Sequence, residues 1–358
     1  MTPRSPQRMA IVGTGLAGAH CAHMLAQAGH TVQVFDKARG PGGRLATRRA
    51  EWVDADGATH TTRLDHGAVG ITARSKVFQG FVDHAVRMGW MAEWLPRLGP
   101  GSLPLDEGTK LLLPVPDMPE LCRRLLDGVT ATCSFAVDAL HHEPQGWRLA
   151  SGGERHEEHF DAVVLAIPPA QAAPLLGPHR RDWARHAALA SMQPCWTLMG
   201  VADAPDPEPG WDLARPASGP LAWVLRSDAR PGRARMPGQA HWVAHARAGW
   251  SRRHLEETPE WAQQQLQEAL ADHIGHPVHW HHATAHRWRY AQPQSQRLAL
   301  TESCWWDASL GLGVCGDFLG GAGAEGAWLS ARSLGTALLE PGNDAMTHEP
   351  RHIQPLVA

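Results

Sequence analysis

The first hydrophobic segments of the chain alternate in the order strand, helix, strand. Residues 9–12 form a short apolar run, which is typical of a strand buried on both faces of a sheet. A helical stretch over 19–28 follows, and Gly29 stands where a helix end favours a left-handed residue. Residues 31–35 form a second apolar run that closes on Asp36. This order predicts one βαβ unit of a parallel sheet.

Farther along the chain, helical and strand patterns continue to alternate. Apolar residues recur every three to four positions over 76–94, and a second helix is expected over 116–126. Residues 161–167 form an apolar run that ends at two prolines, which predicts another buried strand. At the C-terminal end, a strand over 311–317 enters a glycine-rich turn, and a helix is expected over 324–339.

Between residues 195 and 290 the pattern changes to repeated strands. The strand-like runs are 195–201, 221–226, 241–247 and 278–290. A single helix, at 259–274, interrupts them. Runs of strands with few crossover helices favour a mostly antiparallel sheet, and therefore a second domain.

Composition and charge narrow the class of protein. The 358 residues are 43% hydrophobic and 19% charged, so the chain can bury a large core, and two domains are expected. The net charge is −3 with no basic stripe, which argues against nucleic acid as a partner. No apolar run is long enough to span a membrane, and residues 1–8 lack the apolar stretch of a signal peptide. The six cysteines include no CxxC pair, so we expect reduced thiols and a cytoplasmic location.

A glycine motif fills the turn between the first strand and the first helix. Gly13 permits the tight turn, Gly15 lets the backbone approach a pyrophosphate, and Gly18 allows close packing of helix on strand. The helix N-terminus stabilises phosphate charge. Asp36 follows Gly18 by 18 residues and can accept hydrogen bonds from ribose hydroxyls. The pattern predicts a dinucleotide site of the Rossmann type.

The glycine motif alone does not distinguish NAD from FAD, but two later segments favour FAD. Gly42-Gly43-Arg44 directly follows Asp36, where many flavoproteins place a second glycine-rich segment over the dinucleotide. Gly316-Asp317 is where such proteins bring an acid to the ribityl chain. The helix that follows would point its positive N-terminus at the flavin ring, where charge develops on reduction.

The motifs and their order along the chain resemble those of the renalase family, a branch of the amine-oxidase-like flavoproteins. The first and last blocks are shared with the wider superfamily, and the central blocks resemble the bacterial renalases more specifically. The matching blocks are Gly13-x-Gly15-x-x-Gly18, Asp36-Lys37, Gly42-Gly43-Arg44-Leu45-x-Thr47, Leu64-Asp65-x-Gly67-Ala68, Ala92-Glu93-Trp94, Ala166-Ile167-Pro168, Met192-Gln193-Pro194-Cys195-Trp196, Trp242-Val243-Ala244-His245, Trp250-Ser251-x-x-His254-Leu255-Glu256, His286-Arg287-Trp288-x-Tyr290-Ala291, and the run from Cys315-Gly316-Asp317 to Ser330.

The resemblance implies an α/β protein of two domains, similar in fold to p-hydroxybenzoate hydroxylase. A Rossmann-type domain would bind FAD non-covalently, and a mostly antiparallel sheet would form the substrate domain. The FAD-binding domain is expected at 1–70, 105–170 and 300–340, the substrate domain at 71–104 and 171–299, and a disordered tail at 341–358. Renalases oxidise isomeric dihydronicotinamides of NAD(P)H by hydride transfer to flavin N5, and dioxygen then takes the electrons and gives hydrogen peroxide.

The resemblance also assigns site residues. It places His245 in the catalytic role and His66, Val69 and Trp288 at the substrate. The residues expected to bind the cofactor are Gly13, Gly15, Ala17, Gly18, Asp36, Lys37, Gly43, Arg44, Gly67, Ala68, Val137, Gly316, Asp317, Glu325, Gly326 and Ala327.

One segment departs from the renalase pattern, so the sequence does not determine the identity of the substrate. Renalases usually carry Gln and an aromatic residue after Gly67-Ala68, whereas this chain has Val69-Gly70-Ile71. The alternatives are a flavin amine oxidase, a flavin monooxygenase, and a flavin-binding protein without turnover. Many amine oxidases place a lysine of the substrate domain near flavin N5, but this chain has no lysine after Lys110, which disfavours the first alternative.

His245 lies on the less apolar side of its predicted strand. Trp242, Ala244 and Ala246 share one apolar face, which should pack inward, and His245 lies on the opposite face with His241. From the residues alone, this second face could equally be exposed to solvent or line a binding site. The resemblance favours a site, because renalases keep a histidine here that projects toward the flavin.

Four histidines near the end of the strand-rich region have the composition of a metal site. Alternation along a strand places His279 and His281 on one face and His282 and His286 on the other. Four ligands on opposite faces do not converge on one ion. We therefore expect no metal site here.

Overall fold

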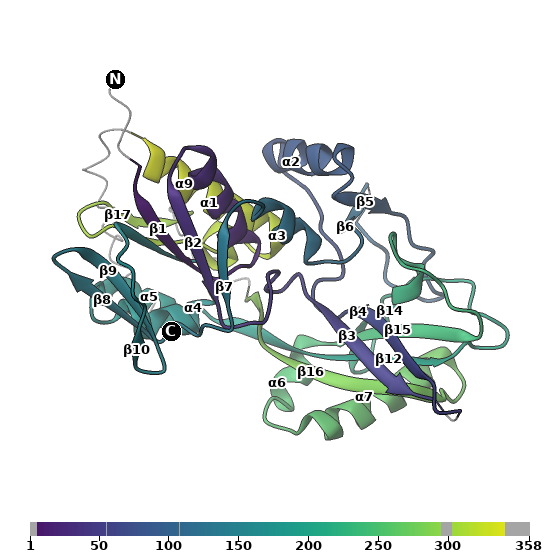
Figure 1. Ribbon diagram of the computed structural model, residues 1–358. Helices are drawn as coiled ribbons and strands as arrows, with labels where there is room; N and C mark the ends of the chain where they lie inside the picture. The colour runs from purple at the N-terminus through teal and green to yellow at the C-terminus, as the bar shows by residue number, and fades with distance from the viewer. Residues whose placement is uncertain (1–5, 55, 107, 295–302, 341–358) are drawn as a thin grey trace, which may run out of the picture.

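The computed structural model describes residues 6–54, 56–106, 108–294 and 303–340. The predicted tail at 341–358 lies outside these residues. The described chain forms two sheet-centred parts, one on each side of Figure 1. Among the described residues, none of the helices combines the length and the apolar character needed to cross a membrane.

A six-stranded sheet with the order β17-β18-β11-β1-β2-β7 forms the first part. Its strands are β1 (Arg8–Val12), β2 (Thr31–Asp36), β7 (Thr130–Cys133), β11 (Ala162–Leu165), β17 (Trp305–Asp307) and β18 (Leu312–Val314). All neighbouring strands run parallel except β17, which pairs antiparallel with β18. The two central strands are buried along nearly their whole length because layers cover both faces of the sheet.

Helices cover one face of this sheet, and helices with a small sheet cover the other. The first face packs against α1 (Leu16–Gln27), α3 (Glu120–Leu125) and α9 (Gly323–Leu339). The second face packs against α4 (Pro169–Leu176), α5 (Arg181–Leu189) and the antiparallel strands β8 (Ala139–Glu143), β9 (Gly146–Ser151) and β10 (Glu154–Arg155). This arrangement confirms the predicted Rossmann-type domain.

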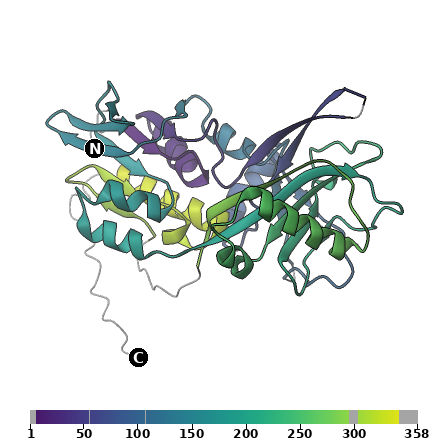
Figure 2. The same cartoon turned by 90° about the horizontal axis from the view of Figure 1, so that it is seen from below.

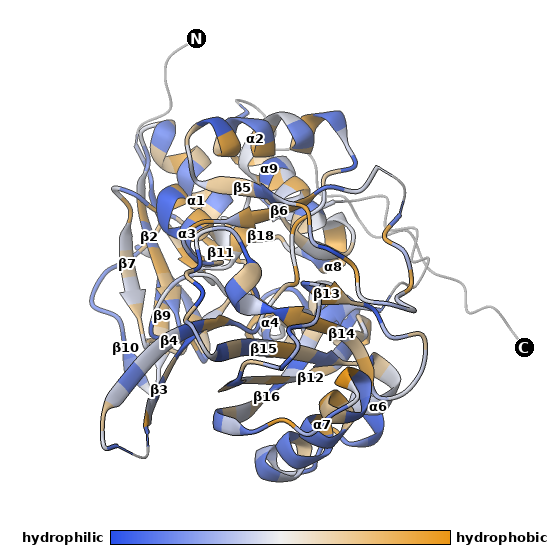
Figure 3. Ribbon diagram, turned by 90° about the vertical axis from the view of Figure 1, so that its right-hand side faces the viewer, coloured by the Kyte–Doolittle hydropathy of each residue, from blue (hydrophilic) through white to orange (hydrophobic). Residues whose placement is uncertain are grey.

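The second part is a five-stranded antiparallel sheet with the order β13-β14-β15-β12-β16. Its strands are β12 (Met192–Asp203), β13 (Leu213–Ala214), β14 (Leu221–Arg226), β15 (Gln239–Ala246) and β16 (Trp280–Pro293). One face packs on α7 (Pro259–Ile274), whose outer side is mostly hydrophilic (Figure 3). Seen from below, α7 and the short α6 (Ala248–Arg253) lie on the second part, and α4 and α5 lie on the first (Figure 2).

Two hairpins and the helix α2 lie outside these two sheets and their helix layers. The first hairpin is β3 (Thr47–Val53) with β4 (Thr59–Asp65), and the second is β5 (Met91–Trp94) with β6 (Leu111–Pro114). Between them lies α2 (Lys76–Arg87). In Figure 1 the β3–β4 hairpin extends from the first part across the second sheet.

The α/β fold with a mostly antiparallel second sheet is confirmed, and several predicted element bounds are wrong. The helix expected over 76–94 ends at Arg87, because Gly89 turns the chain with φ +71° and residues 91–94 pair as β5. The helix expected over 116–126 begins only at Glu120. The second domain holds α6 in addition to the single helix expected there, because six residues are too few to show a helical period. The predicted domain boundaries stay a prediction.

His20 is a buried, unpaired histidine in the core between α1, α2 and α9. Its ring stacks on Trp328 at 4.6 Å and lies 5.7 Å from Phe81, and neither ring nitrogen has a hydrogen-bond partner. Burial, with smaller contributions from the charges of His23 and Arg332, lowers the pKa of His20 to about 3. His20 is therefore neutral in the folded protein over the whole physiological range.

We expect His20 to destabilise the fold in acid. In the unfolded chain a histidine binds a proton below pH about 6.5, whereas folded His20, with its pKa of about 3, does not. The free energy of unfolding should therefore fall, by about 1.4 kcal/mol per pH unit for this group, as the pH drops below 6.5. His20→Leu should make the fall between pH 6.5 and 5 less steep in urea titrations. The control is His84→Leu, at an exposed histidine of α2, which should leave the slope unchanged. Equal slopes in the wild type and both variants would contradict the role given to His20.

Candidate functional site

The turn between β1 and α1 has the geometry of a dinucleotide-binding turn. Gly13 adopts φ +107°, and a Cβ there would lie 2.4 Å from the carbonyl oxygen of Ala166. A Cβ at Gly18 would lie 1.9 Å from the carbonyl oxygen of Gly13. Gly15 is the N-cap of α1, and no side chain caps this helix end, whose first turn holds Ala17. The free N–H groups of the first turn are suited to a phosphate.

A second glycine segment packs against this turn, and a third packs against the second. The N–H of Gly42 donates to the carbonyl oxygen of Thr14 at 3.0 Å, and a Cβ at Gly43 would lie 3.0 Å from the Cα of Gly15. A Cβ at Gly67 would lie 2.1 Å from the carbonyl oxygen of Arg44. The N–H of Ala68 donates to that same oxygen at 3.0 Å. The second glycine segment therefore packs closely on the first turn, and the third packs closely on the backbone of the second.

Asp36 lies at the carboxyl end of β2, beside the first glycine turn. One carboxylate oxygen accepts from the N–H of Thr14 at 2.8 Å and from its hydroxyl at 2.5 Å, and the other accepts from the N–H of Ala38 at 2.8 Å. The loop that leads to Val137 lies alongside, because the N–H of Phe135 donates to the carbonyl oxygen of Asp36 at 2.9 Å. These contacts fix the carboxylate and leave lone pairs free for ribose hydroxyls. The neighbouring Lys37 is exposed.

Asp317 begins the short helix α8 (Asp317–Gly320), directly after Gly316, and is 3% exposed. Its two carboxylate oxygens accept from the guanidinium of Arg44 at 2.6 and 2.7 Å. Arg44 and Asp317 were predicted separately as cofactor contacts, and the structure brings them together. Their ion pair connects the second glycine segment with the C-terminal segment.

Glu325, Gly326 and Ala327 form the first turns of α9. The carboxylate of Glu325 accepts from the N–H groups of Arg74 and Ser75 at 2.9 and 2.7 Å, so it holds the chain at the start of α2. A Cβ at Gly326 would lie 1.5 Å from the carbonyl oxygen of Gly321, so this glycine is required for close packing of the turn before α9. The carboxylate of Glu325 is therefore already hydrogen-bonded to backbone N–H groups.

An aromatic cluster connects the third glycine segment with the second sheet. The rings of His66 and Trp288 stack at 5.2 Å, and His286 lies edge-on to both, at 5.0 and 4.5 Å. The indole N–H of Trp288 donates to the carbonyl oxygen of His66 at 3.1 Å. Burial lowers the pKa of His66 to about 3, with the charges of His286, Arg48 and His245 as smaller causes. Two predicted substrate residues therefore lie side by side, and the His66 ring is neutral.

His245 lies in a row of paired residues across the second sheet. Its neighbours are Trp223 on β14 and Thr197 on β12, and Thr197 in turn pairs with His286 on β16. The opposite face of β15, with Trp242, is packed on α7. His245 therefore faces away from the helix layer, as the alternation predicted.

His245 is half-buried, and its ring nitrogen is shielded from solvent. The Nε2 atom of His245 is buried and has no hydrogen-bond partner, and burial followed by the charge of Arg230 lowers the pKa of His245 to about 4. The Nδ1 atom of His66 is buried and unpaired as well. Unpaired buried polar atoms are costly in a closed core, so these atoms are suited to bind a ligand.

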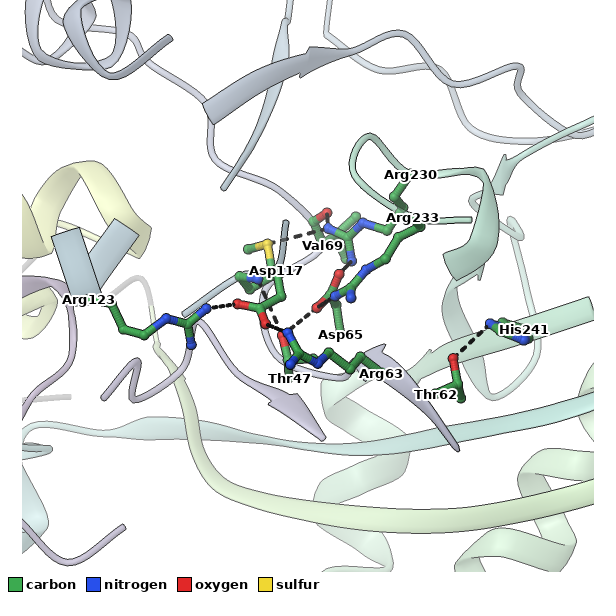
Figure 4. A network of polar contacts seen from close by, with 11 residues as sticks. Thr47, Thr62, Arg63, Asp65, Val69, Asp117, Arg123, Arg230, Arg233 and His241 are labelled. Carbon is green, nitrogen blue, oxygen red and sulfur yellow. Dashed lines mark hydrogen bonds and ion pairs between the residues drawn. The ribbon is translucent and has the colours of Figure 1, made fainter. Parts of the chain in front are cut away.

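Arg230 is a site residue that the sequence did not indicate. It lies in the loop that follows η1 (Ser227–Ala229), and its guanidinium donates to the carbonyl oxygen of Val69 at 2.7 Å (Figure 4). Its sequence neighbourhood is rich in arginine, like much of the chain, so no local signal distinguishes it. Only the fold reveals that the side chain turns inward.

The histidines of β16 separate in the structure. His281 pairs with Asp203 at 2.8 Å, His286 belongs to the aromatic cluster, and His282 stacks on Trp52 of the β3–β4 hairpin at 6.4 Å. Within residues 6–54, 56–106, 108–294 and 303–340, no three His, Cys, Asp or Glu side chains are grouped to hold a metal ion.

Comparisons with known sequences include the following two partial similarities. A family model described as an NAD(P)-binding Rossmann-like domain matches residues 11–85. The bifunctional protein MnmC of tRNA 5-methylaminomethyl-2-thiouridine biosynthesis, from Magnetococcus marinus, is 27% identical over 207 residues. The match covers 48% of this chain and 30% of that protein, so the chain spans about a third of the length of the curated relative that it matches.

Solved structures show a similarity of fold along nearly the whole chain. A putative protoporphyrinogen oxidase from Exiguobacterium sp. 255-15 has a TM-score of 0.69 at 13% identity, and the match covers 94% of this chain and 99% of that one. Putrescine oxidase bound to putrescine has a TM-score of 0.64 at 13% identity, with 93% and 99% covered. Cyclohexylamine oxidase from Brevibacterium oxydans has a TM-score of 0.58 at 13% identity, with 93% and 99% covered. The chain therefore has the two-part fold of these oxidases.

Proposed function

We propose that this chain is an FAD-dependent oxidoreductase that binds FAD non-covalently and oxidises a small reduced molecule. The observation that carries the proposal is the packing of Gly43 on the Gly13–Gly18 turn at the uncapped N-terminus of α1, with Gly67 packed in turn on the backbone of Arg44. Asp36 lies beside this turn, and Asp317 is joined to the second segment through Arg44. The oxidase folds reported above support the same class.

The residues present fit the two ends of such a dinucleotide. The backbone at Gly15 and Gly43 would lie against the pyrophosphate, and Asp36 would accept from the hydroxyls of the adenosine ribose. Asp317 would receive the ribityl chain, with Arg44 as its partner. No cysteine or histidine is marked for covalent attachment, which favours a cofactor that dissociates.

The proposed reaction is of the renalase type. Bound FAD would accept a hydride from a carbon of an isomeric dihydronicotinamide and pass two electrons to dioxygen, giving hydrogen peroxide. The protein has to hold the substrate ring in place and exclude water. His66 and Trp288 offer stacked ring faces for this purpose, and neutral His245 offers a ring nitrogen as a hydrogen-bond partner.

The reaction class is tested by anaerobic mixing of the purified protein with possible electron donors. We expect a 2- or 6-dihydro isomer of NAD(P)H to bleach the visible flavin absorbance faster than benzylamine or a polyamine does. Admission of air should then restore the absorbance and give hydrogen peroxide. If amines reduce the flavin and every dihydronicotinamide isomer fails, an amine oxidase is the better assignment. If no small donor reduces it, the flavin is structural.

The cofactor itself is tested by denaturation. The protein should purify yellow and release intact FAD into the supernatant when it is precipitated with acid. Colour that stays in the pellet would contradict non-covalent binding. Absence of any flavin after reconstitution would contradict the proposed function as a whole.

Asp36→Ala is expected to weaken FAD binding by about 1.5–3 kcal/mol, because a hydrogen bond to a charged group is lost. The measurement is the dissociation constant of FAD, from the recovery of flavin fluorescence on dilution. The control is Asp127→Ala, which removes an exposed carboxylate after α3 and should leave the constant unchanged. An unchanged constant in Asp36→Ala would show that the ribose is bound elsewhere.

A further inference from the structure

Two cysteines stand opposite each other at the ends of the antiparallel strands β17 and β18. The register of this strand pair includes Trp305↔Val314, so the next residues to face each other are Cys304 and Cys315. Both cysteines pack with the core on the α1 and α9 side of the sheet, whereas Trp305 and Val314 pack on the other side. The two thiol groups therefore project from neighbouring strands onto one face of the sheet.

A side chain of α9 bridges the backbone just beyond this pair. The hydroxyl of Ser330 accepts from the N–H of Gly316 at 2.9 Å and donates to the carbonyl oxygen of Ser303 at 2.5 Å. Ser303 and Gly316 are the next residues in the same register. Cys304 and Cys315 are thus held together from two sides, by the strand pair before them and by this hydroxyl after them.

The geometry of this cysteine pair is suited to a disulfide. The N–H of Cys315 donates to the carbonyl oxygen of Leu165 in β11 at 3.1 Å, so the backbone of Cys315 is directed away from β17. Cys315 therefore faces Cys304 as a non-hydrogen-bonded pair of an antiparallel ladder. The Cα atoms of such pairs lie about 4.5 Å apart, within the range of about 4.4–6.8 Å that disulfides span.

The cysteines differ in how easily an oxidant reaches them. Cys304 is half-buried, whereas Cys315 and the neighbouring Cys21 of α1 are buried. Burial raises the pKa of Cys21 to about 12, and the charge of Cys304 adds to the increase. Burial also raises the pKa of Cys315, with the charges of Cys21 and Cys304 as further causes. Because the thiolate is the reactive form, Cys304 is the thiol that reacts first, and Cys315 follows only at close range.

We propose that Cys304 and Cys315 form a reversible disulfide when hydrogen peroxide reaches them. The sulfur of Cys304 first attacks peroxide, so that the O–O bond breaks, an S–O bond forms and one water leaves. The thiol of Cys315 then displaces the oxygen of this sulfenic acid, and a second water leaves. Together the two thiols lose two electrons and two protons, and one peroxide becomes two waters.

This disulfide would close the loop between β17 and β18 directly before Asp317, the residue proposed to receive the ribityl chain. β17 is a strand of three residues at the edge of the sheet, so its detachment is the easiest way for this segment to open. A cross-link at Cys304 would oppose that opening. The inference goes beyond the proposed function, which enters only as a source of oxidant, since an oxidase that reduces dioxygen releases peroxide beside its own cysteines.

The test is treatment of the FAD-loaded protein with hydrogen peroxide, followed by peptide mapping with mass spectrometry. Trypsin leaves Cys304 and Cys315 in one peptide, residues 298–332, and Cys21 in another, residues 9–37. We expect the peptide 298–332 to lose two hydrogen atoms and to regain them with dithiothreitol. Cleavage before Asp307 should give two fragments that stay linked until they are reduced. A link to the peptide 9–37, or sulfinic acid at Cys304 without any link, would overturn the proposal.

Variants test the order of the two steps. Cys315→Ser should stop the reaction at the sulfenic acid of Cys304, which dimedone labels. Cys304→Ser should leave Cys315 unlabelled, because the buried thiol does not react alone. The control is Cys21→Ala, which removes the third thiol of the cluster and should form the same disulfide as the wild type. Dimedone on Cys315 in Cys304→Ser, or a disulfide that is lost in Cys21→Ala, would contradict the proposed pair.

The urea midpoint of unfolding shows whether the bond fits the fold. The oxidised wild type should unfold at a higher urea concentration than the reduced protein, because the cross-link restricts the unfolded chain. The increase should disappear with dithiothreitol and be absent from Cys304→Ser. Dithiothreitol leaves methionine sulfoxide in place, so only the reversible part of the change is assigned to the disulfide. An unchanged or lower midpoint would show that the strands do not accommodate the bond.

This inference and the proposed function fail in different ways. Because peroxide is added, disulfide formation does not depend on turnover by the protein itself. A protein that takes up no flavin on reconstitution contradicts the proposed function, and peptide mapping of that same protein still decides whether the disulfide forms. A protein that is reduced by dihydronicotinamides and forms no disulfide keeps the proposed function and removes the thiol pair.

Discussion

Gly18→Ala is expected to abolish FAD binding and to destabilise the fold by about 1–3 kcal/mol or more, as overpacking of a filled position does. A Cβ at this position would lie 1.9 Å from the Gly13 carbonyl oxygen and 3.2 Å from the Cβ of Ala166. The first of these atoms is backbone of the turn itself, so the clash is relieved only if α1 moves away from β1. That movement would open the turn where the pyrophosphate is proposed to bind.

The measurements are the flavin content after reconstitution and the free energy of unfolding in urea. Gly80→Ala is the matched control, because Gly80 lies in the helix α2 with open space around its Cα. Alanine is the better helix former there, so the control should be neutral or stabilised by up to about 1 kcal/mol. If Gly18→Ala keeps both its flavin and its stability, the turn does not bind a dinucleotide.

Local order in the sequence explains why the first part of the fold was predictable. Strand, glycine turn, helix, strand and acid follow one another within 36 residues, and contacts inside this segment join its parts. Thr14 and Asp36, for example, are joined directly by two hydrogen bonds. Alternation along β15 likewise predicted which face carries His245, because period 2 depends only on neighbouring residues.

The parts that the sequence did not predict depend on contacts between distant segments. The ion pair of Arg44 with Asp317 joins residues 273 positions apart, so their separate motifs gave no sign of it. Arg230 is turned inward by its contacts with Val69 and Asp65, and nothing in its own segment distinguishes it from exposed arginines. The short strand β5 was taken for helix because its partner β6 lies beyond the sequence window that sets the helical period.

His245→Ala is expected to slow reduction of the flavin by roughly ten- to a hundredfold, which corresponds to about 1.4–2.8 kcal/mol in the transition state. The Nε2 atom of His245 is buried without a partner, and burial, followed by the charge of Arg230, lowers the pKa of His245 to about 4, which keeps the ring neutral. A neutral ring can donate or accept one hydrogen bond and so orient the substrate. Hydride transfer needs no separate proton abstraction, so the residue is expected to assist rather than to be essential.

Anaerobic stopped-flow mixing with the best donor measures this effect, and FAD binding should survive the substitution. The matched control is His241→Ala, on the same face of β15, whose Nδ1 lies 3.3 Å from the Thr62 hydroxyl rather than beside the 66–69 segment. The flavin of this control variant should be reduced at nearly the wild-type rate. Because folded His245 takes up a proton only near pH 4, the wild-type rate should not fall on account of this group between pH 9 and pH 5.5. A fall with an apparent pKa of 6 to 7 that disappears in His245→Ala would instead identify a general base, and an unchanged rate in His245→Ala would remove this histidine from the site.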